Sequence, residues 1–276
     1  MASPAACLIG WPAAHSRSPI IHKYWLKSLN IAGDYRIEAV RPEEFATFLA
    51  GLPARGYVGA NVTMPHKEQA LALAQGDARA RAVGAANTLW FDRGTLRATN
   101  TDVEGFIGNL DASAPGWDRT KDEALVLGAG GASRAVLFGL LERGFGTIHL
   151  ANRTRERAEA LARQFGERVR PIDWRAIEAI LPRARLLVNT TSLGMKGQPP
   201  LELDIQKLAS DAVVADLVSV PLHTPLLLTT RARGLRTADG LGMLLHQAVG
   251  GFTLWFGKRP VVTAELRALV EADLTK

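Results

Sequence analysis

Hydrophobic residues recur along the first hundred positions in short blocks, which alternate between the spacing of a strand and that of a helix. The pattern predicts strands at residues 6–10, 35–40 and 57–62, and helices at 19–29, 42–52 and about 66–73. Strands joined through helices need crossover connections, so we expect a mainly parallel sheet. Residues 88–91 and 95–98 have the pattern of a hairpin that turns on Asp92, Arg93 and Gly94.

The pattern changes after residues 109–122, a stretch that contains Pro115 and Gly116 and has the composition of a linker. Beyond it, nearly uniformly apolar runs predict strands at 124–127, 147–151, 186–189 and 212–217, covered on both faces. A long amphipathic helix is expected at 241–256, and we expect it to return to the first domain because it follows the last of these strands. The chain is therefore predicted to be an α/β protein with two domains.

Length and composition agree with this picture and exclude several classes. The 276 residues suit one large domain or two medium ones, and 47% hydrophobic with 22% charged residues is typical of a soluble globular protein. No apolar run approaches the roughly 20 residues that a membrane span needs, and the N-terminus lacks the layout of a signal peptide. Cys7 is the single cysteine, which excludes an internal disulfide framework and favours the cytoplasm, with the thiol buried in the core.

The formal net charge of +6 raises the question of a nucleic-acid partner. The basic residues are mostly scattered among acids, as at 153–163, and no aromatic RNA-binding motif accompanies them. A basic surface also attracts anionic small molecules. We therefore expect a small anionic ligand and neither nucleic acid nor membrane as a partner.

A glycine-rich loop stands between the strand at 124–127 and a helical pattern at 132–143. Gly128, Gly130 and Gly131 leave bare backbone that a phosphate can approach, and the helix start offers it free N–H groups and a positive dipole end. The match to the dinucleotide fingerprint is imperfect, since Ser133 occupies the third glycine position. A tight strand–helix turn without a ligand is the alternative, but the strand–loop–helix context favours a dinucleotide site.

The end of the next strand indicates which dinucleotide. An NAD site usually places an acidic residue here to bind the ribose 2′-hydroxyl, whereas this chain has Asn152 followed by Arg153, Arg155 and Arg157. Guanidinium groups suit a phosphate, and a carboxylate would repel one. Arginines at a solvated helix start would be unremarkable, but together with the missing acid they favour NADP.

Polar clusters follow several strands of the first half, at the sheet edge where α/β proteins bind ligands. Ser16 and Ser18 precede a helix and are either its caps or two hydroxyls for a ligand. Asn61 and Thr63 would share one side of an extended segment. Two Asn-Thr pairs, at 87–88 and 100–101, are ordinary turn chemistry when taken alone.

Lys67 and Asp102 add a chemical meaning to these clusters. A lysine in the first turn of a helix opposes the helix dipole, so the position of Lys67 hints at function. Oxidation of an alcohol transfers a hydride to nicotinamide and the hydroxyl proton to a nearby base. A Lys–Asp pair in a cleft would serve that reaction.

Taken in order, the motifs HSRSP, NVTMPHK, GAANTL, NTD, GAGGASR, NRT, NTTSLGM and DGLGMLLHQA cover essentially the whole chain and resemble the shikimate dehydrogenase family. The resemblance implies reduction of 3-dehydroshikimate to shikimate with NADPH, in the cytoplasmic pathway to aromatic amino acids. It also implies a split N-terminal α/β substrate domain, here 1–102 and 240–276, with a Rossmann-like NADP-binding domain at 103–239.

The resemblance assigns roles by matching position. Lys67 and Asp102 match the catalytic pair, in which the lysine exchanges a proton with the substrate oxygen and the aspartate orients it. Ser16 and Ser18 match carboxylate anchors, and the ring hydroxyls would be held by Asn61, Thr63, Asn87 and Gln247. The cofactor-binding positions are Gly128, Ala129, Gly130, Gly131 and Ala132 for the pyrophosphate, Asn152, Arg153, Thr154 and Arg157 for the 2′-phosphate, and Thr190, Ser192, Leu217 and Gly240 near the nicotinamide half. No metal is implied, and a monomer or homodimer is expected.

Two residues depart from the family pattern. Ser219 stands where a tyrosine, a substrate contact, is common, and Val103 replaces a common glycine after the NTD motif. Val103 is expected to be tolerated at a helix start. The missing phenol at Ser219 keeps open a related enzyme that acts on quinate or an aminoshikimate. A non-catalytic NADP-binding regulatory module is the third alternative, against which the intact Lys67 and Asp102 argue.

Overall fold

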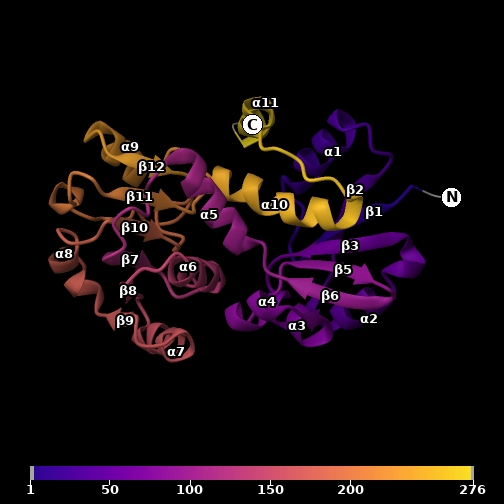
Figure 1. Cartoon of the computed structure of the whole chain (residues 1–276), viewed down its shortest axis with the longest axis horizontal. Helices are drawn as coiled ribbons and strands as arrows, with labels where there is room; N and C mark the ends of the chain where they lie inside the picture. Colours follow the sequence, from indigo (N-terminus) through magenta and orange to yellow (C-terminus); the bar gives the residue numbers. More distant parts are fainter. Residues whose placement is uncertain (1–2, 275–276) are drawn as a thin grey trace. The chain divides into compact units, whose positions relative to one another are not determined.

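The computed structural model describes residues 3–274, which divide into two compact units (Figure 1). Unit 1 contains the described residues up to Glu104 together with those from Leu245 onward, and unit 2 runs from Gly105 to Leu244. Both boundaries fall within helices, α5 (Asp102–Ser113) and α10 (Gly240–Phe256). The first unit is thus built from both ends of the chain, and the second from one continuous segment.

Unit 1 has a six-stranded sheet in the order β2-β1-β3-β5-β6-β4. The strand β1 pairs in parallel with β2 and β3, whereas β5 is antiparallel to β3 and β6, so the sheet is mixed. Its elements are β1 (Ala5–Gly10), α1 (Ser18–Ser28), β2 (Asp34–Ala39), α2 (Phe45–Ala50), β3 (Tyr57–Val62), α3 (Lys67–Leu73), β4 (Gln75–Gly76), α4 (Ala78–Val83), β5 (Thr88–Asp92), β6 (Thr95–Thr99) and, near the C-terminus, α11 (Ala264–Leu274).

The hairpin β5–β6 is tighter than the sequence pattern predicts. Asp92 belongs to β5 and pairs with Thr95, so the turn consists of Arg93 and Gly94 alone. Their φ angles of 49° and 81° are both positive. This is the backbone of a two-residue hairpin turn, whose twist matches that of the flanking strands.

Unit 2 has a six-stranded sheet in the order β12-β11-β10-β7-β8-β9, with every pairing parallel. This is the doubly wound Rossmann order, which reverses direction between β7 and β10 and binds ligands at the carboxyl ends there. Its elements are β7 (Glu123–Leu127), α6 (Gly131–Glu142), β8 (Thr147–Ala151), α7 (Arg155–Phe165), β9 (Val169–Ile172), α8 (Ile177–Ile180), β10 (Leu186–Asn189), β11 (Val213–Asp216), α9 (Pro225–Ala232) and β12 (Arg236–Ala238).

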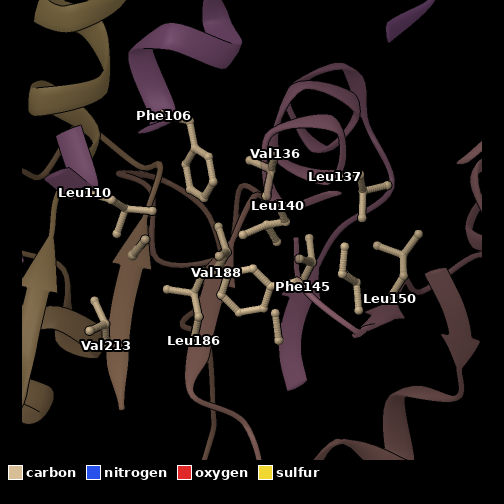
Figure 2. Packing of buried hydrophobic residues seen from close by; sticks show 14 of the residues in the cluster. Phe106, Leu110, Val136, Leu137, Leu140, Phe145, Leu150, Leu186, Val188 and Val213 are labelled. Atoms are coloured by element: carbon tan, nitrogen blue, oxygen red, sulfur yellow. The ribbon is translucent and has the colours of Figure 1, made fainter. Parts of the chain in front are cut away.

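Hydrophobic side chains cover both faces of this second sheet, as the uniform apolar runs predict. On one face, residues of β7 and β10 pack with Val136, Leu137 and Leu140 of α6 and with Phe145 (Figure 2). On the other face, Leu125, Leu127 and Leu187 pack against helices α8 and α9. The sheet is therefore closed on both sides, and its strand ends are the places where it is open to a ligand.

The segment expected to be a linker is partly helical. Helix α5 continues to Ser113 because Phe106 and Leu110 are buried in the unit 2 core. The helix stops before Pro115 and Gly116, and Trp117 then packs back on the same core. Within residues 3–274, no helix is both long and apolar enough to span a bilayer.

Candidate active site

Lys67 and Asp102 form an ion pair in unit 1. Each is the first residue of a helix, α3 and α5 respectively, and the Lys67 Nζ lies 2.5 Å from the Asp102 Oδ2. Their side chains are 24% and 12% exposed, so the pair is largely shielded while one edge stays open. The carboxylate offsets the unfavourable position of Lys67 at a helix N-terminus, which keeps the amine in place.

Asn87 fixes the second oxygen of the carboxylate. Its Nδ2 donates to the Asp102 Oδ1 at 2.8 Å and points to the Gln247 Oε1 at 3.5 Å. Its Oδ1 accepts from the backbone N–H and the hydroxyl of Thr101, at 2.7 and 3.1 Å. Each oxygen of Asp102 thus has its own donor, and the structure brings four predicted site residues of unit 1 together.

Asn61 joins the same network from the end of β3. Its Nδ2 donates to the Asn87 carbonyl at 3.2 Å and to the Thr88 hydroxyl at 3.1 Å. Thr88 and Thr101 are not among the predicted site residues, although both stand inside the family motifs. Their hydroxyls lie 3.0 Å apart and both reach the Asn87 Oδ1, so they hold the two asparagines in one orientation.

The two serines flank Arg17, which is the N-cap of α1 and has no side-chain cap bond. Ser16 Oγ accepts from the Ser18 N–H at 3.2 Å, a local bond at the start of the helix. The Ser16 hydroxyl also donates to the Ser18 Oγ at 3.1 Å, so both hydroxyls lie together. Thr63 lies against Gly10, and its hydroxyl has no hydrogen-bond partner among residues 3–274, so the structure does not connect it to the other predicted residues.

A fully buried histidine packs behind these side chains. His22, on α1, stacks on the Tyr35 ring at a centroid distance of 4.0 Å and an angle of 11°, and Trp25, Phe252 and Trp255 surround it. Neither ring nitrogen has a hydrogen-bond partner within residues 3–274. Burial lowers the pKa of His22 to about 3, and Asn61 offsets only part of that effect. The imidazole is therefore neutral and serves as packing.

The glycine loop of unit 2 meets the requirements of a phosphate-binding loop. Gly128 has a φ of +102°, and a Cβ there would lie 2.6 Å from the Thr190 Oγ1, so the position demands glycine. Around Gly130 and Gly131, a Cβ would meet no atom within 4 Å, which leaves open space above the backbone. Helix α6 begins at Gly131, and its first N–H groups, including that of Ala132, lack intrahelical partners. These features fit the pyrophosphate of a dinucleotide.

Ser133 explains the imperfect fingerprint. Its side chain is fully buried, and its Oγ accepts from the Gly130 N–H at 2.9 Å. The same hydroxyl lies 2.8 Å from the Thr190 Oγ1, which in turn donates to the Leu127 carbonyl at 2.7 Å. The serine therefore ties the loop after β7 to the loop after β10. Thr190 is held inside this arrangement rather than projecting from it.

The residues after β8 fall into three groups. Asn152 is a bridge, since its Oδ1 accepts from the Ala129 N–H at 3.0 Å and its Nδ2 donates to the Thr154 carbonyl at 2.7 Å. Arg153, Thr154 and Arg157 are exposed, and neither arginine has an ion-pair partner among the described residues. Arg155 differs, because its guanidinium pairs with Glu159 at 2.9 Å and with Asp173 at 2.7 Å.

A buried carboxylate organises the loops after β10 and β11. Asp216 accepts from Asn189 at 2.9 Å, from the Val218 N–H at 3.1 Å and from the Thr224 hydroxyl at 2.6 Å. Burial raises its pKa despite these donors. The network shapes the segment that carries Leu217 and Ser219.

Gly240 begins α10 so close to the segment after β11 that a Cβ would lie 2.5 Å from the Leu217 carbonyl oxygen. Ser192 stands exposed in the other loop.

Three family models match the chain in succession. Residues 8–89 match the model of the shikimate dehydrogenase substrate binding domain. Residues 113–195 match the model of shikimate / quinate 5-dehydrogenase, and residues 240–264 match that of the shikimate 5′-dehydrogenase C-terminal domain. The matches follow the order of the motifs and include residues of both units.

Relatives of known name are similar over nearly the full length. The chain is 72% identical over 270 residues to shikimate dehydrogenase (NADP(+)) from Nitrobacter hamburgensis, covering 98% of this chain and 94% of the relative. It is 71% identical to the protein of the same name from Afipia carboxidovorans, covering 99% and 98%.

Among solved structures, two are informative. Quinate dehydrogenase from Corynebacterium glutamicum, in complex with NAD, has a TM-score of 0.90 and 32% identity, covering 98% of this chain and 99% of that one. Shikimate 5-dehydrogenase from Thermus thermophilus, in complex with NADP(H) and shikimate, has a TM-score of 0.83 and 35% identity, covering 98% of both chains. The order of the family models, the identity to the bacterial relatives and the fold together show that this chain belongs to the shikimate dehydrogenase family.

Proposed function

We propose that the chain catalyses the reversible, NADP-dependent interconversion of shikimate and 3-dehydroshikimate in aromatic amino-acid biosynthesis. The observation that carries the proposal is the Lys67–Asp102 pair, with each carboxylate oxygen held by a separate donor. This chain also contains the family motifs in order, and it is about seven-tenths identical to proteins named shikimate dehydrogenase (NADP(+)). Together they supply both a reaction type and a substrate class.

In this proposal the protein residues bind, orient and exchange a proton. Lys67 exchanges the hydroxyl proton with the substrate oxygen. Asp102 orients the Lys67 amine and accepts a hydrogen bond from a substrate hydroxyl. Ser16 and Ser18 bind the substrate carboxylate, while Asn61, Thr63, Asn87 and Gln247 contact the ring hydroxyls. NADP supplies the hydride acceptor when it is bound. Residues 1–102 and 240–276 are assigned to the substrate domain, and 103–239 to the NADP-binding domain.

The cofactor assignment is supported by the free guanidinium groups of unit 2. We assign the 2′-phosphate to Arg153, Thr154 and Arg157, with Asn152 holding this segment on the glycine loop. Gly128 to Ala132 provide the pyrophosphate site, and Thr190, Ser192, Leu217 and Gly240 belong to the nicotinamide half. Arg155 is excluded from the assignment because two carboxylates already engage it.

Steady-state kinetics test the proposed function. With shikimate and quinate, each assayed with NADP and with NAD, we expect the highest kcat/KM for shikimate with NADP. The preference for NADP should be at least about tenfold, since charge-assisted hydrogen bonds to the phosphate are lost with NAD. No turnover with any pair would instead support an NADP-binding regulatory module.

Quinate is the second candidate substrate. Ser219 lacks the phenol common at its position, and the fold is similar to that of a quinate dehydrogenase. A missing neutral hydrogen bond weakens substrate binding by at most about tenfold. The loss is too small to abolish activity with shikimate, so shikimate remains the first candidate substrate. A higher kcat/KM for quinate in the same assay would reverse the order of the two substrates.

Replacing Arg153 with Asp is expected to raise the KM for NADP by at least about tenfold, since the 2′-phosphate loses a charge-assisted partner and meets a carboxylate. The KM for NAD should change little, because NAD has no 2′-phosphate. Initial rates at fixed shikimate and varied cofactor measure both constants.

Arg155→Ala is the matched control. It removes an arginine from the same segment, but one that is paired with Glu159 and Asp173, so the KM for NADP should stay within about threefold of wild type. If Arg153→Asp left the NADP to NAD ratio of kcat/KM unchanged, the phosphate would have to bind elsewhere, with Arg157 as the next position to test.

The cell compartment and the oligomeric state complete the proposal. We place the enzyme in the cytoplasm, which agrees with a lone, buried Cys7 and with a biosynthetic role. A monomer or a homodimer is expected, and light scattering of the purified protein would distinguish the two.

A further inference from the structure

The Tyr35 hydroxyl lies behind the predicted substrate contacts of unit 1. Tyr35 belongs to β2, is fully buried, and donates its hydroxyl proton to the Asn61 Oδ1 at 2.7 Å. Burial raises the pKa of Tyr35 well above its ordinary value, so the phenol keeps this proton. The ring is held flat against His22. Its position is thus set by packing, and the hydroxyl has little freedom to move.

The donors of Asn61 are fully committed to the protein. The two hydrogens of its Nδ2 go to the Asn87 carbonyl and to the Thr88 hydroxyl. Its Oδ1 has two lone pairs, and Tyr35 occupies one of them. Asn61 therefore has no amide hydrogen left for a ligand, and any further hydrogen bond that it makes must be one that its Oδ1 accepts. A substrate hydroxyl that binds here must donate its proton.

Tyr35 also neighbours the serine pair. The Ser18 hydroxyl acts on the Tyr35 hydroxyl as a hydrogen-bonding neighbour and lowers its pKa, although burial has the larger effect. Ser16 in turn donates to the Ser18 Oγ. The buried phenol thus bonds to the residue assigned to a ring hydroxyl and is influenced by one of the two serines assigned to the substrate carboxylate.

We propose that Tyr35 is a positioning residue for substrate recognition, which holds Asn61 with its carbonyl oxygen as an acceptor for a donating substrate hydroxyl. The inference rests on the proposed function, and it adds a residue that no sequence motif marks. Without the phenol, the Asn61 Oδ1 loses a donor that helps to fix its position, and only the two hydrogen bonds from Nδ2 remain. Because the effect passes through Asn61, it should alter binding of the hydroxylated substrate and leave the cofactor unaffected.

Tyr35→Phe tests the inference, because it keeps the ring that stacks on His22 and removes only the hydroxyl. We expect the KM for shikimate to rise about fivefold, as for one neutral hydrogen bond, with the KM for NADP unchanged and kcat little affected. The matched control is Tyr24→Phe, which removes a hydroxyl whose partner is Thr263 and which should leave both KM values as in wild type.

A double-mutant cycle separates positioning from a general structural effect. In an Asn61→Ala background, Tyr35→Phe should raise the KM for shikimate by less than about twofold further, because the residue through which it acts is gone. An equal rise in both backgrounds, or no rise in the single variant, would overturn the inference. Wild-type enzyme that fails to oxidise shikimate would instead contradict the proposed function, so the two failures are distinguishable.

Discussion

Replacing Lys67 with Ala is expected to lower kcat by about 10²-fold or more while changing the KM for shikimate far less, because proton exchange occurs in the transition state. The structure places Lys67 Nζ on Asp102, so the amine is oriented before any ligand binds. Few other changes to a single side chain should affect turnover as strongly. Initial rates over a range of shikimate concentrations, with NADP saturating, measure both constants.

Lys207→Ala provides the comparison for that variant. Lys207 also pairs with a carboxylate, that of Glu178 at 2.6 Å, but belongs to neither set of predicted site residues. Its removal should leave kcat within about twofold of wild type, as expected for an exposed ion pair. A Lys67→Ala enzyme with near-normal kcat would show that another group, or water, exchanges the proton.

The second large effect concerns stability at low pH. His22 has a pKa of about 3 in the folded protein and 6.5 as its ordinary value, so between these pH values the unfolded chain binds a proton that the folded protein does not. The stability associated with neutral His22 is complete above pH 6.5 and is lost as the pH falls towards 3. The expected slope is about 1.4 kcal/mol per pH unit, which gives roughly 2 to 3 kcal/mol by about pH 4.5.

His22→Phe isolates this contribution, since a phenyl ring keeps the aromatic packing and does not titrate. Between about pH 7 and pH 4.5, the free energy of unfolding of the variant should increase by that amount relative to wild type, so that the variant gains relative stability as the pH falls. Urea unfolding at each pH can be followed through tryptophan fluorescence, because Trp25 and Trp255 both contact the ring. His223→Asn, at an exposed position, should leave the wild-type profile unchanged. Parallel profiles for His22→Phe and wild type would contradict the assignment.

Elements whose boundaries are marked by composition could be predicted closely. The strands at 57–62, 147–151 and 186–189 have the bounds that their apolar runs predict, because glycine or asparagine and polar neighbours flank them. The prediction of a linker at 109–122 is wrong over its first part, because α5 continues to Ser113 although the composition up to Pro115 and Gly116 is that of a linker. Asn109 and Ser113 are polar residues of this first part. They lie on α5 instead, where Ser113 bonds to Asn109 and Asn109 bonds to the Asp239 carbonyl. Partners distant in sequence cannot be seen from local composition.

The candidate site shows the same limit. Lys67, Asn87 and Asp102 could be identified because recognisable motifs contain them, and the structure joins them by hydrogen bonds. Whether a polar side chain faces a ligand or the protein depends on its partners. Asn152, matched to the phosphate clamp, is largely occupied in bridging two loops, and Tyr35 stands in no motif at all. Only the folded structure shows which donors and acceptors of a polar side chain are already used within the protein and which are left for a ligand.

The division of unit 1 between the two ends of the chain has a consequence for its biosynthesis. Residues 105–244 leave the ribosome as one uninterrupted stretch, so unit 2 has its whole sequence while the C-terminal segment is still untranslated. Unit 1 must wait for that segment, since Trp25 bonds to the Val261 carbonyl and Trp255 to that of Leu89. The half assigned to the substrate is therefore completed last. A chain that ended before residue 245 would have the whole sequence of unit 2 but would lack Phe252 and Trp255, which pack around His22.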